Sequence, residues 1–210
     1  MERALIERAQ EGDSTAFEQL LLSAQNGVYA LALKMLKHNE QDALDITQDA
    51  FLKAYLSIGK YRGDARFSVW MYRITYNLCL DKLRQTKRRA EAPIDGDDGA
   101  AVLQIADNAP SPEERTLSRE MSEAVQRGLD TLSPKLRAVL VMREASGLSY
   151  AEIATALKMR EGTVKSRINR ARAALAEYLR NDGTFSDAYR QNDVNKNSGA
   201  TADNYDGKGR

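Results

Sequence analysis

Apolar residues recur along this chain at intervals of three and four, which is the spacing of one face of an α-helix. Near the N-terminus such a stripe consists of Phe17, Leu21, Ala24, Val28, Leu31 and Met35. Thr15 and Glu18 have the spacing of a capping box, which predicts the start of this helix, and Gly27 weakens it near its middle. No segment shows the alternation of β-branched and polar residues that a strand exposed on one side would show. The pattern therefore predicts an all-α protein.

Further helices follow from the same spacing and from start signals. One covers about residues 42–58, and its buried side consists of Ile46, Ala50 and Ala54. The next begins near Phe67 and runs to a basic cluster at residues 84–89. In the C-terminal half, residues 111–114 and 133–134 each place a proline at the first helical position, and Gly147 is a stop signal.

Residues 148–175 predict a helix-turn-helix. Ser149 and Glu152 form a capping box for its first helix, and the second helix begins near Glu161 and Gly162. The buried stripe of the second helix consists of Val164, Ile168, Ala171 and Leu175. The opposite face consists of Gly162, Ser166, Asn169, Arg170 and Ala173, flanked by Lys165 and Arg172 on one side and by Thr163 and Arg167 on the other. Small, amide and guanidinium groups between cations suit a DNA major groove, where the flanks hold phosphates and the centre reads base edges. The alternative is a solvated basic helix in an ordinary bundle.

Composition divides the chain and limits its environment. An acidic segment rich in proline and glycine predicts a linker at residues 93–111 between a domain at 1–92 and a domain at 112–180, and a polar, aperiodic tail at 181–210 is expected to be disordered. The chain has 31 Lys and Arg against 30 Asp and Glu, but the charges are segregated. A lone cysteine, Cys79, suits a reducing compartment and excludes a zinc site built from several cysteines. A charged N-terminus and the lack of a long apolar run predict a cytoplasmic protein without a membrane span.

Two helices carry candidate binding residues. Asp45, Gln48, Asp49 and Leu52 form a strip on the helix at about 42–58. Such a strip can dock a basic partner helix, or it can simply be a solvated face. On the helix after Phe67, the spacing of Arg73, Asn77, Arg84 and Arg88 predicts a polar stripe, interrupted by Leu80. The aromatic residues beside it, Trp70, Tyr72 and Tyr76, either stack on unpaired bases or belong to the core, which we favour for Trp70. We expect His38 at the surface and Cys79 in the core.

From about residue 8 to residue 180, the chain resembles the extracytoplasmic-function group of the sigma-70 family of bacterial sigma factors. The motifs that carry the resemblance, in the family's order, are AFEQLL, DALDITQDAFLKAY, YRGDARFSVWMYRITYN, LSPKLRAVLVMREASGLSYAEIATAL and EGTVKSRINRARAAL. The resemblance implies a sigma-2 helical bundle and a sigma-4 helix-turn-helix, joined by a flexible acidic linker, that give RNA polymerase core its promoter specificity. It also implies an anti-sigma factor as a partner.

The resemblance also implies a role for each set of candidate residues. The residues expected to dock on the polymerase are Asp45, Gln48, Asp49, Phe51 and Leu52, against the clamp helices of the largest subunit, while the flap is a second polymerase contact. The residues expected at the minus-ten element, where one base is flipped out of the duplex, are Tyr61, Arg62, Asp64, Phe67, Arg73, Asn77 and Arg84. The residues expected at the minus-thirty-five duplex are Thr163, Lys165, Ser166, Arg167, Asn169, Arg170 and Arg172.

This chain departs from the family at Arg160, where many relatives have proline, and Asn169 occupies a variable position that tunes the sequence read. Two other classes of function are alternatives. A stand-alone helix-turn-helix regulator would leave the acidic strip without a purpose. A nucleic-acid-processing enzyme would need a metal-ligand cluster or an acid–base pair, and neither occurs in the pattern. We therefore expect a protein that is not an enzyme and uses no cofactor, metal or small-molecule substrate.

Overall fold

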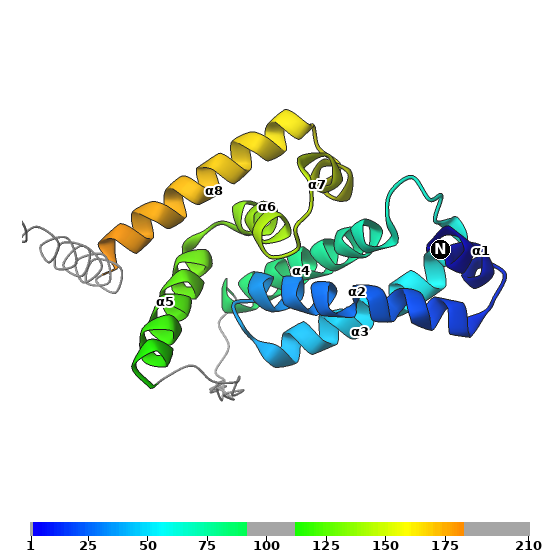
Figure 1. Cartoon of the computed structure of the whole chain (residues 1–210), viewed down its shortest axis with the longest axis horizontal. Coiled ribbons are helices and arrows are strands. Elements are labelled where there is room, and N and C mark those ends of the chain that lie inside the picture. Colours follow the sequence, from blue (N-terminus) through cyan, green and yellow to red (C-terminus); the bar gives the residue numbers. More distant parts are fainter. Residues whose placement is uncertain (1, 92–111, 183–210) are drawn as a thin grey trace, which may run out of the picture. The chain divides into compact units, whose positions relative to one another are not determined.

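The computed structural model describes residues 2–91 and 112–182, and all of the regular elements in these residues are helices (Figure 1). They are α1 (Glu2–Gln10), α2 (Ser14–Met35), α3 (Glu40–Ser57), the short 3₁₀ helix η1 (Ile58–Lys60), α4 (Phe67–Glu91), α5 (Pro112–Thr131), α6 (Pro134–Glu144), α7 (Tyr150–Leu157) and α8 (Glu161–Asn181). The all-α prediction is confirmed. The predicted linker and the predicted tail from residue 183 onward lie outside the described residues.

Several predicted helix boundaries are confirmed, one of them by its cap. The capping box of α7 is present in both directions: Ser149 Oγ accepts from the Glu152 amide at 3.2 Å, and Glu152 Oε2 accepts from the Ser149 amide at 2.8 Å. Pro112 and Pro134 are the first residues of α5 and α6. Gly147 follows α6 with a φ of +66°, as a stop signal requires.

The predicted capping box at Thr15 is wrong. The N-cap of α2 is Asp13, whose carboxylate accepts from the Ala16 amide at 3.0 Å. Arg8 donates to the same carboxylate through Nε at 2.9 Å, so a side chain from α1 fixes the cap. The bond to Ala16 and the contact with Arg8 lower the pKa of Asp13. Similarly, α3 begins two residues before the predicted Asp42, because Asn39 caps it.

The contacts between helices divide the described chain into two compact units. The first contains residues 2–91 and 132–172, and the second contains residues 112–131 and 173–182. In the first unit α2 packs on α3 and α4, while α6 packs on α2 and α7 packs on α4. The domain boundaries expected from composition remain a prediction.

Two clusters of apolar side chains form the core of the first unit. One contains Leu31, Met35, Tyr72, Tyr76 and Cys79 together with Val141, Met142, Ile153, Val164 and Ile168. The other contains Phe17, Leu20, Val28, Ala50, Ala54, Phe67 and Trp70. The buried positions predicted for α2, α3 and α8 are confirmed, although Leu21 and Leu175 are only half-buried. Burial raises the pKa of the Cys79 thiol to about 12, so this thiol is protonated at neutral pH.

A buried guanidinium joins α6 to the end of α2. Arg137 is 2% exposed, and its Nη1 donates to the carbonyl of Met35 at 2.9 Å. Its Nη2 donates to the carbonyl of Leu132 at 3.2 Å. Met35 is the last residue of α2, where carbonyls lack partners within the helix. Arg137 therefore supplies the hydrogen bond that the helix itself cannot.

In the second unit, the end of α8 lies close against α5. A Cβ built on Gly128 would approach Leu175 Cδ1 to 2.5 Å and Tyr178 Cδ1 to 2.9 Å, so a larger residue would separate the two helices. Arg127 donates through Nη2 to Asp182 at 3.0 Å, which ties the end of α8 to α5. Glycine at position 128 thus permits the close helix–helix contact.

Candidate nucleic-acid interface

The loop between η1 and α4 is built over three aromatic rings. The Tyr61 and Trp70 centroids lie 4.9 Å apart, and the Phe67 centroid lies 6.2 Å from that of Tyr61 and 5.6 Å from that of Trp70. The Tyr61 hydroxyl donates to the Ala65 carbonyl. Burial, with Glu2 and Asp64 nearby, raises the pKa of Tyr61 to about 12, so it keeps this proton at neutral pH. Gly63 makes the turn with a φ of +74°.

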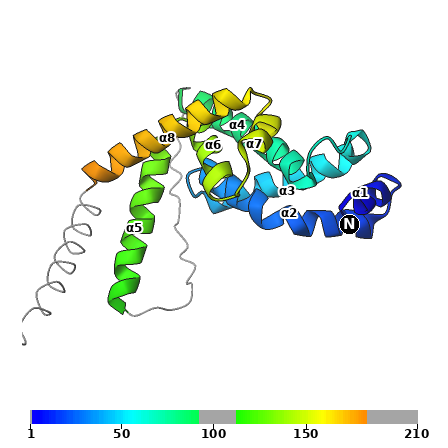
Figure 2. The same ribbon diagram turned by 45° about the horizontal axis from the view of Figure 1, so that its top comes forward.

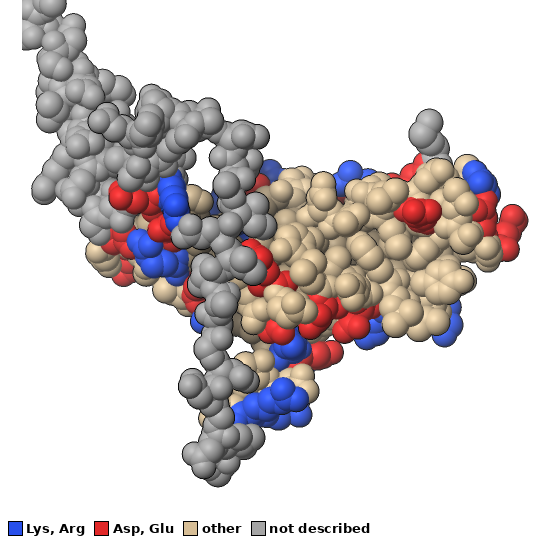
Figure 3. Space-filling view, turned by 90° about the horizontal axis from the view of Figure 1, so that it is seen from below, with Lys and Arg blue, Asp and Glu red and all other residues tan. Residues whose placement is uncertain are grey.

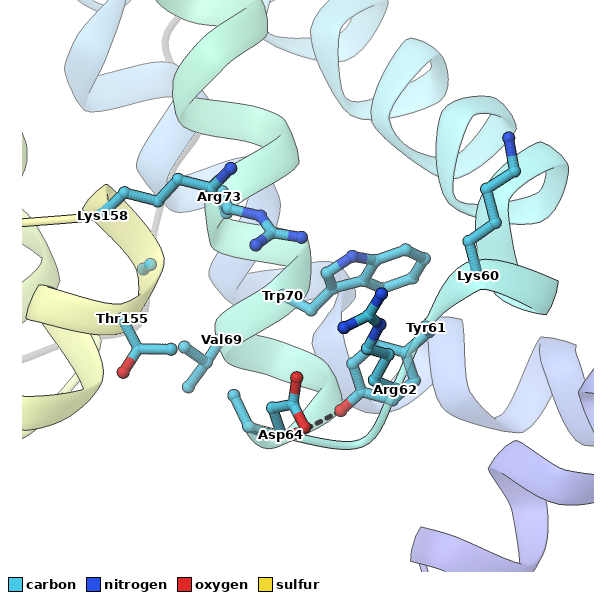
Figure 4. A pocket seen from close by; sticks show the side chains of 11 residues that line it. Lys60, Tyr61, Arg62, Asp64, Val69, Trp70, Arg73, Thr155 and Lys158 are labelled. Atoms are coloured by element: carbon cyan, nitrogen blue, oxygen red, sulfur yellow. Dashed lines mark hydrogen bonds between the residues drawn. The ribbon is translucent and has the colours of Figure 1, made fainter.

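A cavity of about 390 Å³ opens between this loop, α4 and α7 (Figure 4). The loop and α4 contribute Lys60, Tyr61, Arg62, Asp64, Ala65, Val69, Trp70 and Arg73, and the end of α7 contributes Thr155, Ala156 and Lys158. The indole of Trp70 lies between Arg62 and Arg73 in this view (Figure 4). An aromatic face beside two guanidinium groups is suited to an unpaired base and its phosphates.

Asn77 borders a second hollow farther along α4. This hollow is lined by Arg73, Tyr76, Asn77, Ala156, Leu157 and Lys158. Arg73 and Lys158 line both hollows, so the loop residues that line the first hollow and Asn77, which lines the second, border one continuous surface. Asn77 is exposed there, and its amide can both donate and accept.

Two of the residues predicted for the minus-ten element lie apart from these hollows. Phe67 is 1% exposed beneath the loop and lines neither hollow, so in this conformation it supports the loop from below. Arg84 lies farther along α4, exposed and paired with Asp81 at 3.0 Å. Two residues outside the predicted minus-ten set also line the cavity: Trp70, which the sequence offers as a stacking residue or a core residue, and Lys158, which no sequence pattern indicates. Trp70 belongs to the core, as favoured, but also lines the cavity, and Lys158 ends α7 with a φ of +51°.

The predicted strip on α3 is exposed. Asp45, Gln48, Asp49 and Leu52 all face solvent, while Phe51 is half-buried. Large apolar side chains are also exposed on α3, and one is exposed on the neighbouring α2. They are Leu44, Leu52, Tyr55 and Leu56 on α3, of which Leu56 is 73% exposed, and Leu22 on α2. Figure 3 looks at the molecule from the side on which α3 lies in Figure 1, and acidic side chains gather there beside a broad uncharged surface. The pattern of the sequence predicts the acidic residues of this strip but gives no sign of the exposed apolar side chains Leu44, Tyr55 and Leu56.

The predicted reading face of α8 is exposed in the structure. Gly162, Ser166, Asn169, Arg170 and Ala173 are all open to solvent, and the buried stripe lies opposite. Arg170 donates to Ser166 Oγ at 3.3 Å, which holds its guanidinium along the helix. Of the two flanks, Arg172 pairs with Glu144 through Nε at 3.1 Å, and Arg167 lies 3.8 Å from the sulfur of Met159.

Comparison with known proteins identifies two regions of the chain that match family models. A family model described as Sigma-70 region 2 matches residues 20–89, and one described as Sigma-70, region 4 matches residues 122–175. The RNA polymerase sigma-H factor of Pseudomonas aeruginosa is 39% identical over 184 residues, covering 85% of this chain and 93% of that protein. The ECF RNA polymerase sigma-E factor of Escherichia coli strain K12 is 36% identical over 181 residues, covering 83% of this chain and 92% of that protein.

Solved structures share the fold. The sigma factor RpoE of Bartonella quintana, in complex with the anti-sigma factor NepR, aligns with a TM-score of 0.64 at 24% identity, covering 78% of this chain and 96% of that one. CnrH, in complex with the cytosolic domain of CnrY, aligns with a TM-score of 0.62 at 26% identity, covering 86% of this chain and 98% of that one. Among the described helices, none combines the length and apolar character needed to cross a bilayer.

Proposed function

This chain belongs to the extracytoplasmic-function group of the sigma-70 family, the factors that give RNA polymerase its promoter specificity, and we propose which of its surfaces perform each step. The face of α3 docks on the polymerase core. The loop before α4 captures an unpaired strand, and the exposed face of α8 reads duplex DNA. The single observation that carries this assignment is the presence of an exposed acidic and apolar face on α3 in addition to the DNA-reading helix.

The chemistry of the exposed face of α3 supports docking through this helix. Asp45 and Asp49 lie one turn apart and are open to solvent, so they are available to cationic side chains of a partner. Leu52 and Leu56 beside them are 59% and 73% exposed, so covering them with a partner would bury apolar surface and favour binding. The clamp helices of the largest polymerase subunit are the proposed occupant, and the flap is the proposed second contact.

Promoter melting needs preferential binding of the open strand. A base leaves the duplex at a cost of a few kcal/mol, and contacts made only to the flipped base and its strand offset that cost. Arg62, Trp70 and Arg73 line the cavity that we propose for this base, and Asn77 contacts a neighbouring position. The chain thus drives melting by differential binding, without an enzymatic reaction or a cofactor of its own.

Duplex recognition at the minus-thirty-five element is assigned to α8. Ser166, Asn169 and Arg170 on its exposed face offer groups that pair with base edges in a major groove. Lys165 and Arg172 on one flank and Thr163 and Arg167 on the other hold the phosphates. Arg160 leads into this helix, and its carbonyl accepts from the Thr163 amide at 2.9 Å, so the turn forms without a proline.

We further propose that an anti-sigma factor controls this chain in the cytoplasm. Support comes from proteins of the same fold, since RpoE of Bartonella quintana is bound to the anti-sigma factor NepR and CnrH is bound to the cytosolic domain of CnrY. Such an antagonist would compete for the surfaces assigned above to polymerase and DNA.

Run-off transcription tests the proposal. Purified core polymerase with this chain should start transcription at defined positions on a library of upstream fragments, and core alone should not. A stand-alone regulator would instead bind DNA with an affinity that core does not change. Defined starts that depend on the chain support the sigma assignment, whereas core-independent DNA binding without such starts contradicts it.

A further inference from the structure

Helix α1 lies beside the loop that we assign to strand capture, although α1 precedes the residues matched by the family model, 20–89. Figures 1 and 2 both place α1 next to the segment that follows α3, and α1 contacts η1. Two side chains of α1, one near each of its ends, make hydrogen bonds to the backbone of this segment.

Gln10, at the end of α1, holds the start of the loop. Its Nε2 donates to the carbonyl of Ile58 at 3.0 Å and to that of Tyr61 at 2.8 Å. These two carbonyls lie at the first residue of η1 and directly after its last residue, so one amide group closes the turn from outside. Gln10 is itself exposed, which means that the contact serves the loop and does not fill the core.

Glu2, at the start of α1, holds the other end of the loop. Its Oε1 accepts from the amide of Phe67, the first residue of α4, at 2.8 Å across 65 positions of sequence. The first amides of a helix have no partner within the helix, and a carboxylate there also interacts favourably with the helix dipole. Glu2 therefore acts as an N-cap supplied by a distant helix.

The two contacts enclose the part of the loop that lines the cavity. Between Tyr61 and Phe67 lie Arg62, Gly63 and Asp64, which are exposed and are held within the loop by the bond from Tyr61 to Ala65. We propose that Glu2 and Gln10 are positioning residues that hold this loop in the conformation that captures the unpaired strand. This inference rests on the proposed function, because it assigns α1 to the same site.

The expected consequence is a loss of strand binding without a loss of polymerase binding. Binding an already ordered loop avoids the loss of conformational entropy that ordering it would require. The hydrogen bonds of Glu2 and Gln10, which order the loop in advance, therefore contribute to affinity for the strand. The docking face on α3 receives neither contact, and core affinity should not depend on either side chain.

The test uses the full chain assembled with core polymerase. Glu2→Ala and Gln10→Ala remove the hydrogen bonds from α1 to the loop, and Glu2→Gln retains an acceptor for the Phe67 amide. Glu7→Ala is the matched control, because Glu7 is an exposed acidic residue of α1 whose side chain pairs with Arg3 at 3.1 Å and not with the backbone of the loop. The probe is a labelled single-stranded oligonucleotide with the non-template sequence of a start site mapped by run-off transcription.

We expect strand affinity to fall about fivefold for each hydrogen bond removed. Glu2→Gln should recover part of the loss from Glu2→Ala, and Glu7→Ala should match wild type. Core affinity should stay within about twofold for all variants, measured at a temperature where each variant is folded. Equal strand affinities in Glu2→Ala, Gln10→Ala and Glu7→Ala would overturn the inference alone. A wild-type holoenzyme that starts no specific transcription would overturn the proposed function, and the inference with it.

Discussion

The side chain of Tyr72, on α4, lies directly over Gly27, in the middle of α2. A Cβ built on Gly27 would lie 3.0 Å from Tyr72 Cζ and closer still to its hydroxyl oxygen. Glycine appears in the sequence as a weak point of α2, but the structure gives it a purpose, since its missing side chain lets the two helices approach. Tyr72 is 7% exposed and belongs to the apolar cluster that also contains Leu31 and Met35 of α2.

Gly27→Ala should therefore destabilise the protein, although alanine favours a helix. Overpacking costs about 1–3 kcal/mol, which exceeds the gain in helix propensity of about 1 kcal/mol. Adding Tyr72→Phe to the Gly27→Ala protein should recover part of the lost stability, because it removes the hydroxyl oxygen, the atom nearest to the new Cβ. Gly162→Ala is the control, since no atom lies within 4 Å of a Cβ there. Urea unfolding of wild type, Gly27→Ala, the double variant and Gly162→Ala measures the change in stability. A Gly27→Ala protein as stable as wild type would contradict the prediction.

Arg137→Met should cost about 1–3 kcal/mol, because it leaves the carbonyls of Met35 and Leu132 without this donor in a buried site. Arg137→Lys should also be less stable than wild type, since one ammonium group lacks the planar guanidinium fork that reaches both carbonyls. Lys135→Met on the exposed side of α6 should change stability by less than about 0.5 kcal/mol. Equal unfolding midpoints for the Arg137 and Lys135 variants would show that the buried bonds contribute nothing.

The double variant Asp45→Lys/Asp49→Lys should lose several kcal/mol of affinity for core polymerase by bringing like charges together. Both carboxylates are exposed, so the fold should persist. Glu7→Lys/Glu11→Lys changes the net charge equally at exposed positions away from α3 and should bind core normally. Competition binding against wild type measures the difference. If the α3 variant bound core as well as its control, the docking assignment would fail.

Arg170→Ala should lose about 1–3 kcal/mol of promoter affinity and relax specificity at one base position. Arg172→Ala should weaken binding equally on all sequences and reduce the salt slope by about one. Because Glu144 pairs with Arg172, Glu144→Gln should strengthen binding on all sequences by releasing that guanidinium for phosphate. Single-base promoter variants measured at several salt concentrations separate these effects, and a uniform loss for both arginine variants would contradict the division of α8 into reading and holding faces.

Glu152 should make stability depend on pH. Its bond to the Ser149 amide, followed by its bonds to the Ser149 hydroxyl and Arg66, lowers its pKa below the ordinary value of 4.5. The stabilisation is therefore complete above that ordinary value and is lost as the pH falls through the lower pKa of the folded state. Glu152→Gln should be less stable than wild type at pH 7, and the gap should close in acid. Unfolding midpoints from pH 7 down to pH 3 would show whether it does.

Local pattern was sufficient to predict most of the helices. The buried sides of α2, α3 and α8 follow from apolar spacing alone, because a helix repeats its environment every three to four residues. The cap at Ser149 and the proline starts at Pro112 and Pro134 were also predicted, since each depends on residues within one turn. The exposed reading face of α8 follows from the same periodicity.

Features that join distant residues could not be predicted in this way. Asp13 displaces Thr15 as the cap of α2 because Arg8 folds back onto it, and Glu2 reaches an amide 65 positions away. The sequence likewise gives no sign that Phe67 would lie beneath the loop, or that Lys158 would line the same cavity as Trp70.

The sequence by itself determined where the longer helices lie after residue 13, which of their sides are apolar, and which family the chain resembles. Only the tertiary structure decided why Gly27 is glycine, what Arg137 binds, and which helix holds the loop before α4. The physical reason is the range of the interactions. Helix spacing and capping are set by neighbours in the chain, whereas close packing and the pairing of buried polar groups depend on which surfaces meet after the chain has folded.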